Sequence, residues 1–369
     1  MRITSLSIES ARNLAAVHLA PGPRFNVFYG DNGQGKTNLV ETVYVLATLR
    51  SFRTSRLADL IARGAPHARL AARVVKDDLE RRYQVAIEPT RRVVTLDGKT
   101  PRPLARYFGA FNVVLFAPED LGVARGAPAE RRRFLDRAVF ARHASYLETA
   151  QAYEKVLRSR NAVLRAAGAG DRKALDLLPV YDLQLAPLAV AIVEARQRYL
   201  AELRPRFEAA FEAITRTGFP VALEHVTAPE LAARDAAAIG DALTRDRGRD
   251  LARGSTSLGP HRDDLVFRMA GEVAANYASQ GQLRALVLAW KTAEMDLLRD
   301  AHGDPPILLL DDVSSELDEA RNLYLFEHLA QRDLQCFITT THPRHVRLGS
   351  DRLDHEVRQG SISVVKSTV

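Results

Sequence analysis

GDNGQGKTNL, residues 30–39, is the stretch that decides the fold. A glycine, four free positions and then Gly-Lys-Thr is the pattern of a phosphate-binding loop, in which backbone N–H groups point at phosphate oxygens at the start of a helix. The apolar run FNVFY (25–29) precedes the loop, and TNLVETVYVLATL (37–49) follows it with helical spacing. A glycine-rich turn could match by chance. The strand–loop–helix order instead favours binding of ATP or GTP.

Each part of this loop has an expected task. Lys36 would reach the β- and γ-phosphates as a point charge, and the hydroxyl of Thr37 would bind Mg²⁺. The candidate nucleotide-binding residues of the loop are Gly30, Asp31, Asn32, Gly33, Gln34, Gly35, Lys36, Thr37 and Asn38.

Length and charge narrow the class of protein. The chain has 369 residues, 46% of them hydrophobic, and can bury a sizeable core as two domains or as one domain with a large insertion. Its net charge of +7 favours a polyanionic partner, nucleic acid before a membrane surface. The first residues lack a signal-peptide pattern, and LQLAPLAVAIV (183–193) is too short to span a bilayer. We expect a cytoplasmic protein without a membrane partner, with its single Cys336 buried and reduced.

Strand and helix patterns divide the chain into three blocks. Short strands are expected at 3–8, 25–29, 68–75, 82–87, 91–96 and 111–116, and again at 221–226, 265–269, 305–312 and 334–340. Helical patterns occupy 128–166, 180–216, 281–300 and 316–331. The sequence therefore predicts an α/β fold with a helical insertion, in three parts: residues 1–119, 120–253 and 254–369.

ILLLDDVSSELD (307–318) supplies an acidic partner for the phosphate loop. Asp311 ends a strand that is apolar throughout, and open α/β sheets bind their ligands at the carboxyl ends of strands. It would hold Mg²⁺ directly or through water, and Asp312 would polarise the attacking water. The alternative is that both acids cap the following helix. The phosphate loop upstream favours the catalytic interpretation.

The segment YASQGQLRALVLAW (277–290) adds a second anion site. Ser279, Gly281 and Gln282 resemble the Ser-Gly-Gly-Gln signature of ABC-type ATPases, with Gln280 in place of the first glycine. A serine and backbone amides at a helix start can meet a γ-phosphate, although a serine N-cap is the simpler alternative. The order of loop, signature, acidic strand and then His342 favours the signature, with His342 as a γ-phosphate sensor.

Further motifs point to one family. RNL (12–14), VLFAPEDL (114–121), RRRFLD (131–136) and GPHRDD (259–264) join the motifs above, and together the chain resembles the RecF family of bacterial recombination proteins. RecF proteins are similar to the ATPase heads of SMC and Rad50 chromosome proteins without the long coiled-coil arm. The resemblance implies an α/β fold of the ABC/SMC-type P-loop ATPase head, with a helical lobe inserted between its two sequence halves.

The resemblance also assigns residues around the nucleotide. It implies that Arg12 and Asn13 of the RNL stretch lie beside the nucleotide, and that PEDL occupies the place of the Q-loop. Glu119 stands there where related ATPases often have glutamine, which leaves a direct metal contact open. ABC-type ATPases usually follow the Mg²⁺ aspartate with glutamate, whereas Asp312 is one CH₂ shorter. Since a displacement of about 1 Å can cost ~10²-fold in rate, we expect slow turnover, as in a timed switch.

For function, the resemblance implies that ATP and Mg²⁺ drive a head-to-head homodimer. This dimer would bind double-stranded and single-stranded DNA, especially duplex next to single-strand gaps, and cooperate with RecR and RecO in loading recombinase. The processes implied are recombinational repair, replication-fork maintenance and the SOS response, with a weak, DNA-stimulated ATPase. A transporter subunit and a P-loop kinase remain alternatives. The large helical insertion argues against the first, and a kinase requires neither the signature nor His342.

RRR (131–133), with Arg125 and Arg137 nearby, is the densest basic stretch beside the helical insertion and a candidate DNA contact. On a helix these side chains spread around the axis, so some would pair with Glu130 or Asp136 instead of phosphate. The DNA-binding candidates are Arg131, Arg132 and Arg133.

Overall fold

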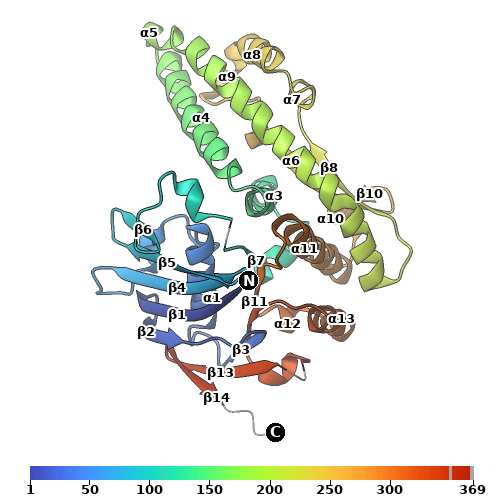
Figure 1. The fold of residues 1–369 in the computed structure, drawn as a ribbon. Coiled ribbons are helices and arrows are strands. Elements are labelled where there is room, and N and C mark those ends of the chain that lie inside the picture. Colours follow the sequence, from blue (N-terminus) through green and yellow to red (C-terminus); the bar gives the residue numbers. More distant parts are fainter. Residues whose placement is uncertain (110, 349–350, 366–369) are drawn as a thin grey trace. The chain divides into compact units, whose positions relative to one another are not determined.

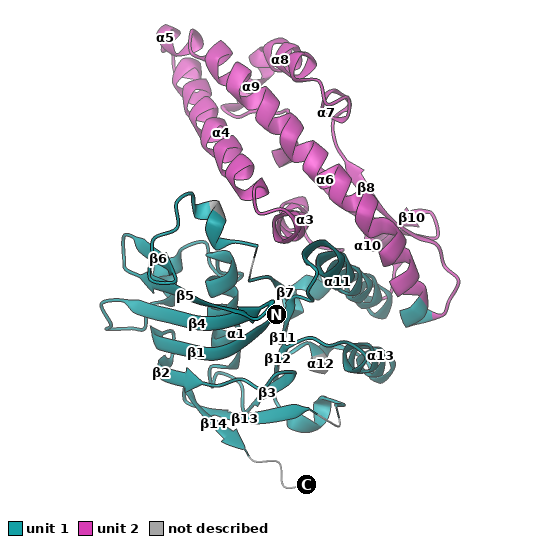
Figure 2. Ribbon diagram, in the orientation of Figure 1, with its two compact units in different colours: residues 1–122, 213–215, 280–369 teal, residues 123–212, 216–279 magenta. Residues whose placement is uncertain are grey.

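The computed structural model describes residues 1–109, 111–348 and 351–365, without the side chains of residues 105, 314 and 315. The chain forms two compact units, shown in Figure 2. Unit 1 consists of residues 1–122, 213–215 and 280–369, and unit 2 consists of residues 123–212 and 216–279.

Unit 1 is built on a mixed sheet of order β14-β13-β3-β12-β11-β7 (Figure 1). Its strands are β3 (Phe25–Tyr29), β7 (Val113–Phe116), β11 (Ile307–Asp311), β12 (Cys336–Thr340), β13 (Arg352–Arg358) and β14 (Ser361–Val365). All neighbours are parallel except β13 and β14. Every residue of β11 and β12 is buried, which confirms the prediction of central strands covered on both faces.

A second, antiparallel sheet of order β2-β1-β4-β5-β6 completes the core of unit 1. Its strands are β1 (Arg2–Ala11), β2 (Leu14–Leu19), β4 (Ala68–Lys76), β5 (Leu79–Ile87) and β6 (Arg92–Leu96). Helix α1 (Lys36–Thr48) shares one hydrophobic cluster with both sheets, through Val40, Val43 and Leu46. The other helical elements of this unit are α2 (Pro118–Leu121), α11 (Gln280–His302), α12 (Val313–Glu316), α13 (Glu319–Ala330), η1 (Leu57–Leu60), η2 (Leu104–Tyr107) and η4 (Pro343–His345).

Unit 2 is mainly helical. Its helices are α3 (Pro128–Arg142), α4 (Tyr146–Gly168), α5 (Arg172–Leu175), α6 (Leu178–Thr215), α7 (Pro229–Ala232), α8 (Ala236–Arg245), α9 (Arg247–Arg253), η3 (Pro260–Arg262) and α10 (Ala274–Tyr277), although the last three residues of α6 count with unit 1. The strands β8 (Val221–Val226), β9 (Asp264–Met269) and β10 (Glu272–Val273) form a small sheet.

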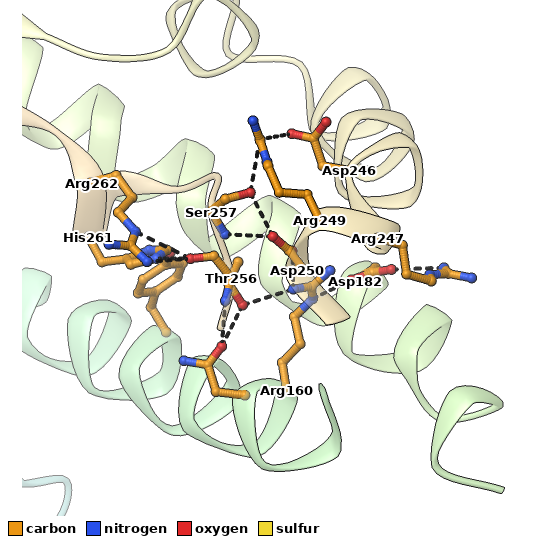
Figure 3. A network of polar contacts seen from close by, with 12 residues as sticks. Arg160, Asp182, Asp246, Arg247, Arg249, Asp250, Thr256, Ser257, His261 and Arg262 are labelled. Atoms are coloured by element: carbon orange, nitrogen blue, oxygen red, sulfur yellow. Dashed lines mark hydrogen bonds and ion pairs between the residues drawn. The ribbon is translucent and has the colours of Figure 1, made fainter. Parts of the chain in front are cut away.

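Buried polar contacts fix the 254–264 segment inside unit 2 (Figure 3). The guanidinium of Arg160 is fully buried and pairs with Asp182 at 2.6 Å and Asp250 at 2.8 Å. It also donates to Thr256 Oγ1. The ring nitrogen Nδ1 of His261 lies 2.7 Å from the hydroxyl of Tyr153 on α4. Burial lowers the pKa of His261 to about 4, so its ring is neutral near pH 7.

These contacts explain where the units divide. The sequence placed the second boundary after residue 253, whereas the compact units divide after residue 279. The reason is that β9 pairs antiparallel with β8 along its whole length, and the loop before β9 is anchored on α4 and α6. The segment that carries GPHRDD therefore belongs to the helical unit.

The longest helix also has an apolar surface. Within the described residues, one helical stretch, Arg172–Thr215, is long and apolar enough to cross a membrane by length and composition alone. Buried core helices pass the same test. Helix α6 buries Arg196, which pairs with Asp136 at 2.9 Å and with Asp263 at 3.1 Å. Packing inside unit 2 thus accounts for part of this apolar surface.

Candidate nucleotide site

The phosphate loop connects β3 to α1 in unit 1. Gly30, Gly33 and Gly35 have φ values of 150°, 80° and 119°, a region that favours glycine. Gly35 is the N-cap of α1, and a Cβ there would lie 2.8 Å from Asn13 Oδ1. A Cβ at Gly30 would collide with the carbonyl of Val357. Gly30 and Gly35 therefore leave no room for a side chain, and Gly33 has a backbone conformation that favours glycine.

The amine of Lys36 lies inside the loop. Its Nζ donates to the carbonyls of Gly30 at 2.6 Å and Asp31 at 2.8 Å, and the residue is 6% exposed. Burial lowers the pKa of Lys36, while the nearby carboxylates of Asp312, Asp311 and Asp31 act in the opposite direction. Lys36 is thus a cation held at the loop by dipoles that a phosphate could replace.

Two threonine hydroxyls bind the acidic end of β11. Thr37 Oγ1 donates to Asp311 Oδ1 at 2.9 Å, and Thr339 Oγ1 donates to the same oxygen at 2.8 Å. Burial raises the pKa of Asp311 most; these hydroxyl bonds lower it, and the charges of Glu119 and Asp312 raise it. The structure therefore joins two predicted metal ligands that lie far apart in the sequence, and it adds Thr339.

The chemistry of this group fits a Mg²⁺ ion bound together with phosphate. Hydroxyl and carboxylate oxygens are the ligands that Mg²⁺ prefers, and Mg²⁺ commonly takes only one or two carboxylates plus substrate phosphates. Across the described part of the chain, no group of three or more His, Cys, Asp or Glu side chains could hold a metal by itself. Thr37 and Asp311 are accordingly a partial ligand set, and a cation would offset the burial and the neighbouring charges that raise the pKa of Asp311.

Asp312 differs from Asp311 in its backbone. It has φ 50° and ψ 25°, a left-handed conformation that begins α12. Its N–H donates to Thr339 Oγ1 at 3.0 Å and to the Thr339 carbonyl at 3.2 Å. Two successive aspartates thus leave the strand with different backbone directions, as expected if they have separate tasks.

Arg12 and Asn13 of the RNL stretch bond to helix α1 and to the backbone of the phosphate loop. Arg12 donates to both carboxylate oxygens of the fully buried Glu41 at 3.1 Å each. Asn13 Nδ2 donates to the carbonyl of Gln34 at 3.0 Å, and Asn38 Nδ2 donates to Asn13 Oδ1 at 2.8 Å. The structure places these side chains on α1 and the loop backbone, where they hold the loop in shape.

A C-terminal hairpin also holds the loop, and sequence reasoning missed it. The backbone N–H of Gln359 donates to Gln34 Oε1 at 2.6 Å, and that of Gly360 donates to the Gln34 carbonyl at 2.8 Å. The turn between β13 and β14 positions both groups. A signal was present, since HEVRQGSISVV is two strand-like runs around a glycine-containing turn.

The signature residues lie across the division between the units. Ser279 is exposed and ends the second segment of unit 2, whereas Gly281 and Gln282 lie in the first turn of α11 in unit 1. The guanidinium of Arg321 approaches Gly281 so closely that a Cβ there would lie 3.1 Å from it. His342 is also exposed; it follows β12, and its Nδ1 accepts a hydrogen bond from the Arg344 N–H at 3.1 Å.

The arginine triplet on α3 divides into two engaged side chains and one exposed one. Arg131 donates to Asp264 through Nε at 2.7 Å and Nη2 at 2.6 Å. Arg132 donates to the Asp263 carbonyl at 2.7 Å, and burial lowers its pKa. Arg133 is exposed. Of the three DNA-binding candidates, Arg133 is the one best placed to meet an external phosphate.

Sequence comparisons cover the whole chain. Residues 2–362 match the family described as RecF/RecN/SMC N terminal domain. The chain is 40% identical to the DNA replication and repair protein RecF of Geobacter sp. (strain M21), over 98% of this chain and 100% of that protein. It is 42% identical to the protein of the same name from Myxococcus xanthus (strain DK1622), over 99% of this chain and 97% of that protein.

Solved structures agree on the fold. The recombination mediator protein RecF with ATPrS in the RecFOR pathway matches with a TM-score of 0.89 and 28% identity, over 99% of this chain and 98% of that chain. The Smc head domain of Pyrococcus furiosus matches with a TM-score of 0.54 and 16% identity, over 98% of this chain and 95% of that chain, which supports the fold alone. These matches favour neither a transporter subunit nor a kinase. The fold is that of an SMC/RecF-type ATPase head with a helical region, and the chain belongs to the RecF family.

Proposed function

We propose that this protein is an ATP-gated DNA-binding switch that acts in the cytoplasm in DNA replication and recombinational repair. The observation that carries the proposal is the bond from Thr37 to Asp311, which joins the phosphate loop to the acidic strand as one Mg·ATP site. Relatives over the full length are named DNA replication and repair proteins, and a similar structure is that of RecF with ATP in the RecFOR pathway.

Each of the site residues in unit 1 would have a separate role. Lys36 would neutralise the β- and γ-phosphates, and Thr37 and Asp311 would hold the metal. Asp312 would orient the attacking water, and the exposed His342 would contact the γ-phosphate. When bound, Mg·ATP supplies the γ-phosphate whose presence separates the two states of the switch. Because the Asp312 side chain is one CH₂ shorter than the glutamate of ABC-type ATPases, hydrolysis would be slow and the ATP state would persist.

The signature would complete the site of a second copy. Ser279 is exposed, and with Gly281 and Gln282 it can offer a hydroxyl and backbone amides to the partner's γ-phosphate. ATP then contributes contacts to the interface only while the γ-phosphate remains, so hydrolysis releases the dimer. We expect a monomer or weak dimer without nucleotide and a two-site dimer with ATP.

DNA would bind the basic protein through phosphate contacts, with Arg133 as one of them. Such contacts carry no sequence preference, which suits a protein that recognises duplex next to single-strand gaps. Cooperation with RecO and RecR in loading recombinase is supported by the name of the pathway in which the similar structure is placed.

The deciding experiment mixes two variants and measures both ATPase activity and sedimentation with ATP. Lys36→Ala removes the phosphate-binding charge, and Ser279→Arg puts a bulky cation at the interface; neither alone should form an active dimer. In a mixed dimer, the loop of the Ser279→Arg chain faces the intact signature of the Lys36→Ala chain, so one complete site forms and activity should return. If both variants are folded and mixing restores nothing, or if Ser279→Arg dimerises alone, the shared site is wrong.

A further inference from the structure

An arginine outside all the recognised motifs holds the segment that leads into the signature. Arg125 follows α2 and precedes α3 in unit 2. Its Nη2 donates to the carbonyl of Ala278 at 2.6 Å, and its Nε donates to the carbonyl of Ala275 at 3.2 Å. One guanidinium therefore bonds to two carbonyls within the four residues that precede Ser279.

The held segment cannot fix its own geometry. Helix α10 has only four residues and ends at Tyr277; the next residue, Ala278, is extended with φ −62° and ψ 136°. So short a helix is not stable by itself, and its terminal carbonyls need partners from outside. Burial of Ala274 and Ala278 anchors two points, while Asn276 and Tyr277 are exposed. The two bonds from Arg125 therefore help to set the direction in which the chain enters Ser279.

The contact between Arg125 and residues 275–278 joins the beginning and the end of the sequence of unit 2. The chain first enters unit 2 after Gly122 and leaves it for the last time after Ser279. Arg125 lies just beyond the point of entry, and Ala278 lies directly before the point of exit. Within unit 1, a buried ion pair ties α2 to α11. Asp120 Oδ2 and Lys291 Nζ lie 3.7 Å apart, and the two side chains are 5% and 6% exposed.

We propose that Arg125 is a positioning residue for the signature: it holds residues 275–278 so that Ser279 can meet the γ-phosphate bound by a second copy of this chain. This inference rests on the shared site described under Proposed function. It also gives Arg125 a role other than DNA contact, because its Nε and one Nη2 donor are already bonded to backbone carbonyls.

Arg125→Gln tests the proposal directly. We expect each chain to bind ATP as the wild type does, while ATP-dependent dimerisation and hydrolysis fall ~10- to 100-fold, because a misplacement of about 1 Å has that order of effect. Arg125→Lys keeps one charged donor and should lose less. The matched control is Arg158→Gln, which removes an arginine that is 72% exposed on α4 of the same unit and should match the wild type.

Mixing experiments show which half of the shared site Arg125 serves. Arg125→Gln mixed with Lys36→Ala forms one complete site, from the loop of the first chain and the signature of the second, so ATPase activity should return. Arg125→Gln mixed with Ser279→Arg leaves every site with an impaired signature, so activity should stay low. A residue that served the phosphate loop would give the reverse pattern, and a defect in folding would be rescued by neither partner.

Four results would overturn the assignment. They are weakened ATP binding by the Arg125→Gln monomer, wild-type hydrolysis, rescue by Ser279→Arg, and a flatter salt dependence of DNA binding without nucleotide, which would make Arg125 a phosphate contact. If Arg125→Gln does not fold, Arg125→Lys is carried through the same mixtures and should show the same pattern with a smaller loss. Failure of the Lys36→Ala and Ser279→Arg mixture would reject the shared site itself; success there with the wrong pattern for Arg125 would reject this inference alone.

Discussion

The Asp263-Asp264 pair of unit 2 and the Asp311-Asp312 pair of unit 1 have opposite environments. In unit 2, Asp263 accepts hydrogen bonds from Arg196 and Thr227, and Asp264 accepts hydrogen bonds from Nε and Nη2 of Arg131. In unit 1, Asp311 is bonded by two uncharged hydroxyls and lies near the charges of Glu119 and Asp312.

The contrast separates a structural carboxylate from a functional one. A buried carboxylate that is paired with arginine has its partner within the chain. Removing the carboxylate leaves the arginine as a buried cation without a partner, which destabilises the fold. Burial, together with the charges of Glu119 and Asp312, raises the pKa of Asp311, and a cation from outside would lower this pKa again. Asp263 and Asp264 thus stabilise the unit, whereas Asp311 is poised for a ligand.

The largest effect should come from Asp263→Asn. Asp263 is 3% exposed, and the change leaves Arg196 with Asp136 as its remaining carboxylate partner. We expect the free energy of unfolding to fall by about 3 kcal/mol, the lower end for a broken buried pair. Urea unfolding measures it. Glu224→Gln, which breaks the surface pair with Arg268 in the same unit, should cost about 1 kcal/mol or less; equal losses in the two variants would contradict the contrast.

Asp312→Asn should affect rate without affecting stability. If Asp312 orients the attacking water, turnover should fall by ~10²-fold or more, while ATP binding persists and the dimer accumulates. Single-turnover hydrolysis and sedimentation with ATP are the measurements. Unchanged turnover would remove Asp312 from this role.

Asp311→Asn should reverse the sign seen at Asp263. Burial raises the pKa of Asp311, so the stability that its protonated form contributes is full below the unfolded value of about 4 and is lost as pH rises through the folded value. Without ligand at pH 7, the asparagine variant should therefore be at least as stable as the wild type, and this advantage should vanish near pH 4.

The same variant should lose its response to ligand. Wild-type protein should gain about 2.7 kcal/mol when Mg·ATP is present at 100 times its dissociation constant, and Asp311→Asn should gain little at that concentration. Thermal unfolding with and without Mg·ATP, at pH 7 and at pH 4, tests both statements. A variant that is less stable at pH 7 without ligand would place Asp311 among the structural carboxylates.

The smallest effect concerns the arginine triplet on α3. Arg133→Gln should weaken DNA binding for all sequences and reduce the slope of log affinity against log salt by about one unit. Arg131→Gln should leave this slope unchanged and lower stability instead, because Arg131 is 13% exposed and bonded to Asp264. A flattened slope in Arg131→Gln would mean that the ion pair opens to DNA.

Local sequence patterns predicted the strands and helices that carry the loop and the acidic strand. FNVFY and VALEHV are strands with the expected bounds, and α1 begins one residue before the expected helix. Such elements are encoded by apolar spacing and by glycines within a few residues of one another. The strands β2, β13 and β14 were not predicted. The signal of β13 and β14 around their glycine-containing turn was missed, and β2 is defined mainly by its pairing with β1.

What escaped prediction was set by contacts between distant residues. Thr339 donates a hydrogen bond to Asp311, and Glu41 accepts one from Arg12. Neither Thr339 nor Glu41 belongs to a motif from which its partner could be predicted. Some arginines of the triplet were expected to pair with Glu130 or Asp136, whereas Arg131 pairs with Asp264, which follows it by more than a hundred residues. That carboxylate begins β9, which pairs with β8 and packs against α3.

The order of strands in the large sheet has a consequence for synthesis on the ribosome. Strand β3, which leads into the phosphate loop, lies between β12 and β13, and both are made more than 300 residues after it. Until they emerge, the apolar residues of β3 have neither neighbour in the sheet, while the strands and helices of unit 2 are already complete. The nascent chain therefore carries an unpaired apolar strand through most of its synthesis, the kind of exposed edge that chaperones protect from aggregation.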